Sequence, residues 1–339
     1  SPEHPVTLDV TEVIPAGSVP TYPITEGKAA RIMTGAPVPE GADAIIMHER
    51  TSFTENTVTL TAPVTSANII PPGEDVAAGT LLVPKGKILT ASDLALIAGQ
   101  GIAEIGVYKK LSIGLISTGS ELLNTGSPLE YGKIYNTNPY LLGGYIQKHH
   151  MTANYLSTVR DDLDSLCRAV LDALSEMEQS DGVITTGGVS AGDFDYMPEV
   201  IRRIGGDLLF HRLKFKPGGA MLGAFKDGKV ILGLSGNPGA AATGLLCVGF
   251  PFMRKLSGRS DITFSQTTAY LGVDFKKSSP VTRILKGHSD FKNGMLYFTP
   301  LSNQHNGSVS SMSDCDLLAI IPAGSKPLAA GDKLEVYIL

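Results

Sequence analysis

The 339-residue chain is long enough for two to four domains and carries a formal net charge of −5. Charged residues make up 18% of it and no block of Lys and Arg stands out, which argues against a nucleic-acid or anionic-membrane surface. No apolar run approaches the roughly 18 residues of a membrane span, and no signal-peptide pattern opens the chain. An anionic ligand must therefore be met by a local cluster of donors.

Three cysteines, Cys167, Cys247 and Cys315, lie far apart and lack CxxC spacing. This pattern is typical of reduced, packed thiols and argues against a zinc site. The sequence therefore predicts a cytoplasmic protein.

Residues 1–69 are predicted to be β-rich. Short β-branched runs alternate with Pro and Gly, and they are VTLDVTEV (6–13), AARIM (29–33), DAIIM (43–47) and TVTLT (57–61).

Residues 70–108 form a different piece. Thr90 or Ser92 is expected to cap a helix over residues 91–98, which Gly99 and Gly101 would end. A strand is predicted over residues 103–108.

Residues 109–258 alternate predicted strands with predicted helices. The apolar runs LSIGLI (111–116), DGVIT (181–185) and KVILGL (229–234) each predict a buried strand of a parallel sheet. Helices are expected after Asn138, after Asp161 or Asp162, after Pro198 and after Pro238. The pattern predicts a doubly covered α/β domain.

Residues 259–339 return to β character. The candidate strands are TAYLGVDF, TRILKG, MLYFTPL, DLLAIIP and KLEVYIL, and Lys292-Asn293-Gly294 predicts a tight hairpin turn. A small β-barrel or a sandwich fits this pattern.

Glycine-punctuated loops follow the three predicted central strands, at residues 117–121, 185–195 and 235–238. Because parallel strands present their carboxyl ends at one edge of the sheet, these loops are expected to converge on one pocket. Glycine lets backbone N–H groups approach an anion closely, and Glu121, Asp193 and Asp195 add carboxylates. The combination fits a phosphate ligand with a divalent cation.

Basic residues accompany these loops. On an extended strand Arg212, Lys214 and Lys216 would share one face, and Ser235 with the Gly236 N–H precedes a predicted helix, where anions bind readily. Ordinary roles stay open: the lysines as guards of an edge strand, Glu121 as a first-turn residue, and Asp161 or Asp195 as a helix cap.

Seven motifs spread over essentially the whole chain resemble the molybdopterin molybdenumtransferase family, which includes bacterial MoeA and the E domain of gephyrin. They are RIMTGAPVPEGAD (31–43), PPGED (71–75), STGSEL (117–122), IYNTN (134–138), TTGGVSAGDFDY (185–196), FKPGG (215–219) and LSGNPGAA (234–241). The first two lie outside the α/β domain and make the resemblance specific. The family's N-terminal DGYA-like motif, whose aspartate belongs to its active site, has no counterpart before Ser1. Isoleucine and proline replace the arginines that often precede the family's GED.

The resemblance implies an α/β plus β fold. Residues 1–69 would form a β-rich domain, 70–108 part of a split linker and dimerisation domain, 109–258 a central three-layer α/β molybdopterin-binding domain, and 259–339 a β-barrel. It implies a homodimer that joins molybdate to adenylated molybdopterin and releases AMP, with Mg²⁺.

The residues and the resemblance together predict catalytic roles for Glu121, Asp161, Asp195 and Lys216, with Mg²⁺ held by Glu121 and Asp195. The predicted binding residues are Thr34, Asp75, Thr118, Gly119, Gly187, Gly188, Ser190, Arg212, Ser235, Gly236, Asn237, Pro238, Arg283 and Ser308.

Two alternatives stay open from the sequence. One is another enzyme that uses the same α/β domain, a molybdopterin adenylyltransferase or a CinA-like hydrolase. The other is a gephyrin-like scaffold that binds partner peptides. If the chain is instead the molybdenumtransferase that the resemblance implies, a molybdopterin adenylyltransferase would be its pathway partner. The sequence does not distinguish tungstate from molybdate as the oxyanion substrate.

Overall fold

The computed structural model describes residues 3–61, 63, 68–175, 180–189 and 195–339. Contacts between residues divide the chain into two compact units, 1–82 and 83–339, and each is described by itself. The four-part division predicted from the sequence stays a prediction.

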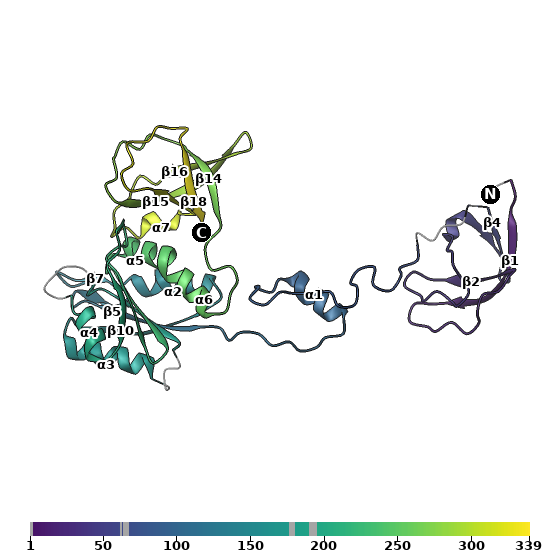
Figure 1. Ribbon diagram of the computed structural model, residues 1–339, viewed down its shortest axis with the longest axis horizontal. Coiled ribbons are helices and arrows are strands. Elements are labelled where there is room, and N and C mark those ends of the chain that lie inside the picture. The colour runs from purple at the N-terminus through teal and green to yellow at the C-terminus, as the bar shows by residue number, and fades with distance from the viewer. Residues whose placement is uncertain (1–2, 62, 64–67, 176–179, 190–194) are drawn as a thin grey trace. The chain divides into compact units, whose positions relative to one another are not determined.

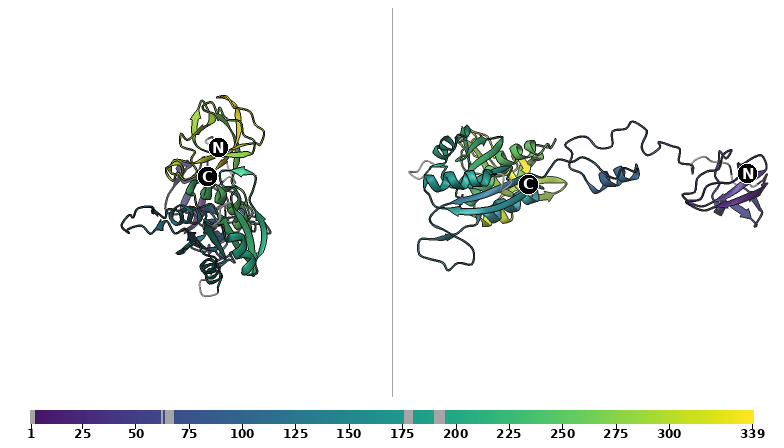
Figure 2. Two further views of the ribbon diagram at one scale, coloured as in Figure 1. Left: turned by 90° about the vertical axis from the view of Figure 1, so that its left-hand side faces the viewer. Right: turned by 90° about the horizontal axis from the view of Figure 1, so that it is seen from below.

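Unit 1 contains a four-stranded sheet of order β2-β1-β4-β3, drawn in purple in Figures 1 and 2. Strand β1 (Val6–Ile14) pairs in parallel with β2 (Lys28–Ile32) and antiparallel with β4 (Thr57–Leu60), which also pairs with β3 (Thr51–Phe53). The strand predicted over residues 43–47 is wrong. That run leads instead into a single 3₁₀ turn, His48–Arg50, and none of the ladders between the described strands includes it.

Unit 2 opens with helix α1 (Ala91–Gly99), capped by Thr90, one of the two cap residues that the sequence leaves open. The Thr90 hydroxyl accepts a hydrogen bond from the Asp93 N–H (3.3 Å), and the Asp93 carboxylate accepts one from the Thr90 N–H (2.9 Å). The Lys87 ammonium, 2.6 Å from this carboxylate, and the Thr90 bonds lower the pKa of Asp93 to about 2.

The strand predicted over residues 103–108 is absent from the single chain. A strand needs a neighbour for its ladder of hydrogen bonds, and no described strand lies beside this segment. Its apolar side chains are consequently exposed, Val107 by 69%.

The centre of unit 2 is a six-stranded sheet of order β10-β12-β13-β9-β5-β8. All strands run in one direction except β12, which is antiparallel to both neighbours. The strands are β5 (Ser112–Thr118), β8 (Thr152–Val159), β9 (Gly182–Thr186), β10 (Asp207–His211), β12 (Leu222–Lys226) and β13 (Lys229–Leu234). A short parallel pair, β6 (Leu122–Leu123) and β7 (Ile134–Tyr135), lies beyond the end of β5.

Helices cover both faces of this sheet, so the predicted three layers are confirmed (Figure 1). On one face lie α2 (Asn138–Lys148) and a continuous helical run made of α5 (Pro238–Gly244), a π-helical turn (Leu245–Gly249) and α6 (Phe250–Leu256). On the other face lie α3 (Leu163–Leu174) and α4 (Met197–Arg203).

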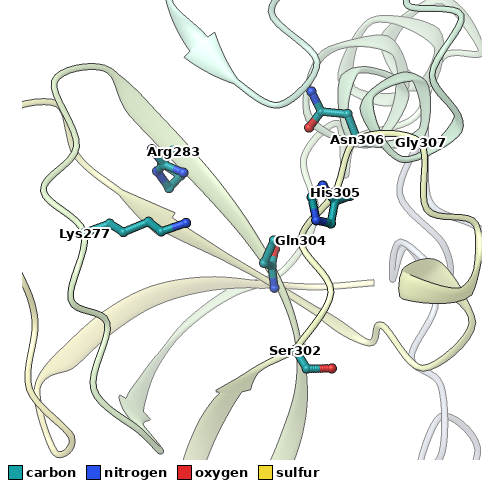
Figure 3. A pocket seen from close by; sticks show the side chains of 7 residues that line it. All are labelled: Lys277, Arg283, Ser302, Gln304, His305, Asn306 and Gly307. Carbon is teal, nitrogen blue, oxygen red and sulfur yellow. The ribbon is translucent and has the colours of Figure 1, made fainter.

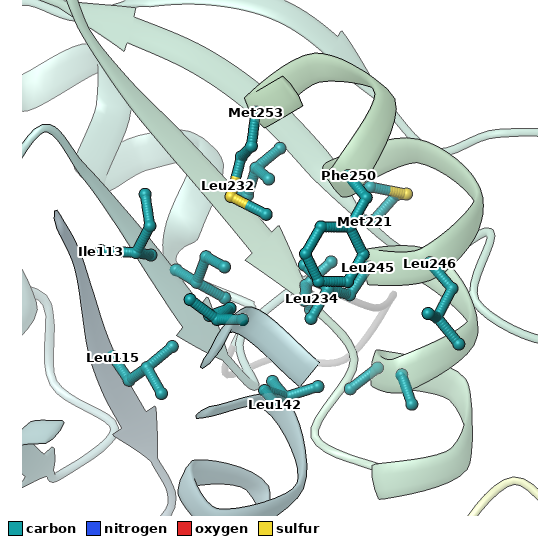
Figure 4. Packing of buried hydrophobic residues seen from close by; sticks show 14 of the residues in the cluster. Ile113, Leu115, Leu142, Met221, Leu232, Leu234, Leu245, Leu246, Phe250 and Met253 are labelled. Atoms are coloured by element: carbon teal, nitrogen blue, oxygen red, sulfur yellow. The ribbon is translucent and has the colours of Figure 1, made fainter. Parts of the chain in front are cut away.

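Each face has its own apolar core. Figure 4 shows the first, in which Ile113 and Leu232 of the sheet pack against Leu142 and Phe250 of the helices. Residues 239–244 of α5 are all buried, and their small side chains let the helix approach the sheet closely.

The C-terminal part is a closed five-stranded barrel, so the barrel rather than the sandwich is confirmed. Its strands are β14 (Gln266–Leu271), β15 (Thr282–Lys292), β16 (Met295–Pro300), β17 (Leu317–Ile321) and β18 (Lys333–Ile338), closed by pairing of β15 with β17. Helix α7 (Ser310–Ser313) lies between β16 and β17. Asn293 and Gly294 have φ of 51° and 76°, as the predicted hairpin turn requires.

A short strand, β11 (Phe215–Lys216), joins the α/β domain to the barrel. It pairs in parallel with the start of β15, where Lys216 lies opposite Arg283. The register thus brings together two cations that are 67 residues apart in the sequence. No helix in the described part of the chain is long and apolar enough to span a membrane.

Candidate functional site

The loops that follow β5, β9 and β13 touch one another at the carboxyl edge of the sheet. A Cβ placed on Gly187, whose φ is +102°, would lie 2.3 Å from the Thr118 hydroxyl, and one on Gly236 would lie 3.7 Å from the Gly187 Cα. A Cβ on Gly119 would lie 2.7 Å from both Glu121 carboxylate oxygens. We call Thr118, Gly119, Gly187 and Gly236 the glycine-loop cluster.

Hydrogen bonds fix this cluster. The Gly187 N–H donates to the Leu234 carbonyl (2.9 Å), and the Asn138 side-chain amide donates to the Gly236 carbonyl (2.9 Å). The Thr118 hydroxyl is buried and has no hydrogen-bond partner among the described residues. Because buried polar atoms are normally paired, this unpaired hydroxyl is a candidate contact for a bound ligand.

Asn138 has a different role from the predicted one. Thr137 is the N-cap residue of α2, without a side-chain cap, and Asn138 is already helical. Its side chain instead reaches a loop 98 residues away in the sequence. Sequence reasoning found the helix start but not this contact, which depends on the tertiary fold.

Two of the predicted acids lie at the first loop. The Asp161 carboxylate accepts a hydrogen bond from the Ser120 N–H (3.2 Å), next to the exposed Glu121. Asp162 rather than Asp161 caps α3, since its carboxylate accepts from the Ser165 N–H (2.8 Å), and that bond lowers the pKa of Asp162. The cap role considered for Asp161 is therefore wrong.

Asp195 is half-buried and precedes α4, whose N-cap position is occupied by Tyr196. Ser190 and Asp193, on the same loop, lie outside the described residues. In the described part of the chain no three His, Cys, Asp or Glu side chains are grouped so as to hold a metal ion by themselves.

Beside the glycine-loop cluster lies a cavity of about 790 Å³ between the α/β domain and the barrel. Lys216 and Arg283 line it from the paired strands β11 and β15. We call it the basic cavity; its other lining residues with polar side chains are Arg212, Ser235, Asn237, Gln304 and Asn306.

The predicted ladder of Arg212, Lys214 and Lys216 on one strand is wrong. Strand β10 ends at His211, Arg212 has φ of +67°, and β11 is only two residues long. The backbone turns here, held by the bond from the Leu213 N–H to the Gly219 carbonyl (2.8 Å). Arg212 and Lys216 still line the cavity, but Lys214 does not.

The barrel supplies a wall that the sequence analysis missed. Gln304 and Asn306 lie on the loop after β16, and the Asn306 carbonyl accepts hydrogen bonds from the Gly239 and Ala240 N–H groups (2.8 and 3.2 Å). The first-turn N–H groups of α5 expected to meet an anion are thus partly occupied by the barrel. The polar run Asn303–Gly307 between two apolar strands was the only sequence signal.

Ser308 lies on the same loop but does not line the basic cavity. Its hydroxyl accepts bonds from the Asn303 side chain (2.9 Å) and the Ser311 N–H (3.1 Å). Pro238 begins α5, next to Asn237 of the cavity wall.

A second, smaller cavity of about 550 Å³ adjoins the first on the barrel. Figure 3 shows Lys277 and Arg283 extending toward one space, with Gln304 and His305 on the loop opposite. Arg283, Gln304 and Asn306 line both cavities. Neither set of described lining residues contains an Asp or Glu, so the local field favours an anion although the whole chain is acidic.

Thr34 and Asp75 belong to unit 1. Thr34 is exposed in the turn after β2, and Asp75 is exposed in a bend. Gly188 follows Gly187, and its carbonyl accepts a bond from the Met197 N–H at the start of α4 (3.1 Å).

A central α/β sheet with this loop cluster, fused to a β-rich unit and a barrel, defines a class of protein that binds its ligand at the carboxyl edge of the sheet. Family profiles cover the chain in three parts: "Probable molybdopterin binding domain" over residues 114–255, "MoeA N-terminal region (domain I and II)" over 2–101, and "MoeA C-terminal region (domain IV)" over 268–339.

Relatives align over the whole chain. This chain is 35% identical to a molybdopterin molybdenumtransferase of Staphylococcus aureus and 36% identical to one of Bacillus subtilis. The alignments cover 80% and 79% of the lengths of these two relatives. A crystal structure titled molybdopterin biosynthesis MoeA protein from Pyrococcus horikoshii matches with a TM-score of 0.83 and 28% identity, over 100% of this chain and 82% of that one. The chain belongs to the molybdopterin molybdenumtransferase family. An adenylyltransferase, a CinA-like hydrolase and a scaffold are not favoured.

Proposed function

We propose that this chain is a transferase of molybdenum cofactor biosynthesis that joins molybdenum from molybdate to adenylated molybdopterin and releases AMP. One observation carries the proposal: the loop Ser235–Asn237 borders both the glycine-loop cluster and the basic cavity. A phosphate-bearing pterin and an oxyanion can therefore meet across a single loop.

The two ligands are assigned to different sites because the sites differ in their chemistry. The glycine-loop cluster suits the pterin phosphates, because glycine has no Cβ and lets phosphate oxygens approach the backbone closely. The basic cavity suits molybdate, because Lys216 and Arg283 offset its charge and none of the described lining residues carries a carboxylate. Holding both anions close together lowers the entropic barrier to their reaction.

Mg²⁺ fits the acids at the loop cluster. This ion is usually held by one or two carboxylates together with substrate phosphates, so a site of three protein side chains is not required. Glu121 and Asp195 are the proposed ligands, and the Asp161 carboxylate accepts a hydrogen bond from the Ser120 N–H, next to Glu121. When bound, the ion would polarise the phosphoanhydride that releases AMP.

A homodimer is also proposed. The apolar residues Leu94, Ile102, Ile105 and Val107 are exposed in one segment of unit 2. Residues 103–108 have strand-forming side chains, but no strand among the described residues lies beside them. A second copy would cover this surface. The three free cysteines are typical of a reducing compartment and support a cytoplasmic location. The proposed pathway partner is a molybdopterin adenylyltransferase, which would supply the adenylated substrate.

The test is a release assay with purified protein and adenylated molybdopterin. AMP is separated by chromatography with and without molybdate and Mg²⁺. We expect AMP release only when molybdate and Mg²⁺ are both present. AMP release that is independent of molybdate would show a hydrolase, and the proposed transfer would be wrong.

A further inference from the structure

Lys286 of β15 is a fully buried lysine, 0% exposed. It lies behind the barrel loop Gln304–Asn306, which forms one wall of the basic cavity. Its ammonium donates to the His305 carbonyl (3.2 Å) and to the Ser311 hydroxyl. Among the described residues it makes no ion pair, so only neutral acceptors compensate its charge. Burying a charge in this way is costly, which calls for an explanation beyond packing.

The backbone of Lys286 holds the same wall. Its N–H donates to the Gln304 side-chain oxygen (3.1 Å), and its carbonyl accepts from the Gln304 amide (2.6 Å) and from the Leu301 N–H (3.0 Å). Gln304 itself lines the basic cavity. One residue therefore holds the loop over residues 301–311 by both its backbone and its side chain.

The ammonium of Lys286 also lies beside the start of α5. A Cβ on Gly239 would lie 3.1 Å from the Lys286 nitrogen and 2.9 Å from the Asn306 carbonyl, so only glycine fits between them. The same Asn306 carbonyl accepts the Gly239 and Ala240 N–H groups. The lysine, the loop and the helix start thus form one connected unit on the barrel side of the cavity.

We propose that Lys286 is the positioning residue of the basic cavity and sets its affinity for a tetrahedral oxyanion that the lysine does not touch. The lysine holds the Gln304–Asn306 wall against α5. It also places behind that wall a positive charge that has no ion-pair partner among the described residues. This inference rests on the proposed function. Burial lowers the pKa of Lys286, and the electrostatic interaction with Cys315 partly opposes this shift. In a buried region a charge acts over a longer range than at the surface.

The test compares Lys286→Met with Lys292→Met. Methionine keeps most of the volume of lysine without its charge. Lys292 is the matched control, because it lies on the same strand but is 63% exposed and pairs with Asp290 on the surface. Molybdate and adenylated molybdopterin are titrated separately by calorimetry, and thermal unfolding checks the fold.

We expect Lys286→Met to weaken molybdate binding by about tenfold, the effect of one charged interaction, and to change pterin binding by less than about twofold. Lys292→Met should change neither. Equal loss for both ligands together with a lower melting temperature would mean that Lys286 only stabilises the fold. An unchanged molybdate affinity would overturn the proposed effect of the Lys286 charge on oxyanion binding.

Amide hydrogen exchange tests the positioning part without any ligand. Exchange at residues 301–311 and at Gly239 and Ala240 should accelerate by about tenfold in Lys286→Met and not in the control. Unchanged exchange would overturn the positioning role. If wild-type protein binds no molybdate, the proposed function fails, and the exchange result still decides whether Lys286 holds this wall.

Discussion

At the scale of the residue, Lys216 is the side chain on which the proposed division of the site most depends. It lines the basic cavity and lies opposite Arg283 in the sheet register. Sequence reasoning selected both residues without knowing that a single strand pairing joins them, because β11 is too short to show periodicity.

Lys216→Ala should weaken molybdate binding by about 1–3 kcal/mol, the range for a hydrogen bond to a charged group. Pterin binding should change less, because it depends on the glycine-loop cluster. Titration calorimetry with each ligand measures both effects. Lys214→Ala is the control, since Lys214 does not line the cavity; an equal loss for both ligands would assign Lys216 to the pterin phosphate.

Glu121→Gln should keep the fold and abolish Mg²⁺-dependent AMP release. Glu121 is exposed and packs against Gly119 rather than in a core, so its loss removes a metal ligand without leaving a cavity. Activity and melting temperature are measured together, with Glu130→Gln as an exposed control. A large fall in melting temperature with a proportionate loss of activity would favour a structural role.

At the scale of the element, the loop after β9 depends on one backbone conformation. Gly187→Ala should lower the melting temperature and impair pterin binding, because its φ of +102° is strained for alanine and its Cβ would meet the Thr118 hydroxyl at 2.3 Å. Gly144→Ala in α2 is the matched control, since nothing lies within 4 Å of a Cβ there. Normal pterin binding by Gly187→Ala would show that the cluster is not the phosphate site.

The end of α2 should make stability depend on pH. His149 packs against Phe250 and Phe264, and burial, with nearby Arg254, lowers its pKa from the usual 6.5 to about 4. The unfolded chain then binds more protons than the native one between these values. This contribution to stability is present above pH 6.5 and is lost as the pH falls toward 4.

Denaturant unfolding at several pH values in that window measures the effect. His149→Asn should flatten the dependence of the unfolding free energy on pH. His150→Asn, at the exposed neighbouring position, should leave it unchanged. Asparagine tolerates the positive φ of 64° at His150, so that control is not strained. The same slope in wild type and His149→Asn would contradict the assignment.

The elements themselves were largely predictable where the pattern was local. The central strands, the Thr90 cap and the Asn293–Gly294 turn depend on neighbouring residues, and the structure confirms them. The strands predicted over 43–47 and 103–108 were wrong, because a strand also needs a partner that no local pattern supplies. The Asn306 contact to α5 likewise arises only when the barrel meets the α/β domain.

At the scale of the whole molecule, the proposed homodimer makes a direct prediction. Sedimentation velocity at micromolar concentration should show a dimer, and Val107→Asp should shift it to monomer by placing a charge on an apolar surface. Val19→Asp is the control, because Val19 is 84% exposed in unit 1. A wild-type protein that stays monomeric would contradict the proposal.

A crystal structure of the protein with molybdate and adenylated molybdopterin would test the proposed division of the site most directly, with the anomalous signal of molybdenum locating the oxyanion. We expect molybdenum in the basic cavity within reach of Lys216 and Arg283, and pterin phosphates at Gly187 and Gly236. Molybdenum in the smaller cavity beside Lys277 and His305 instead, or phosphates away from the glycine loops, would contradict it.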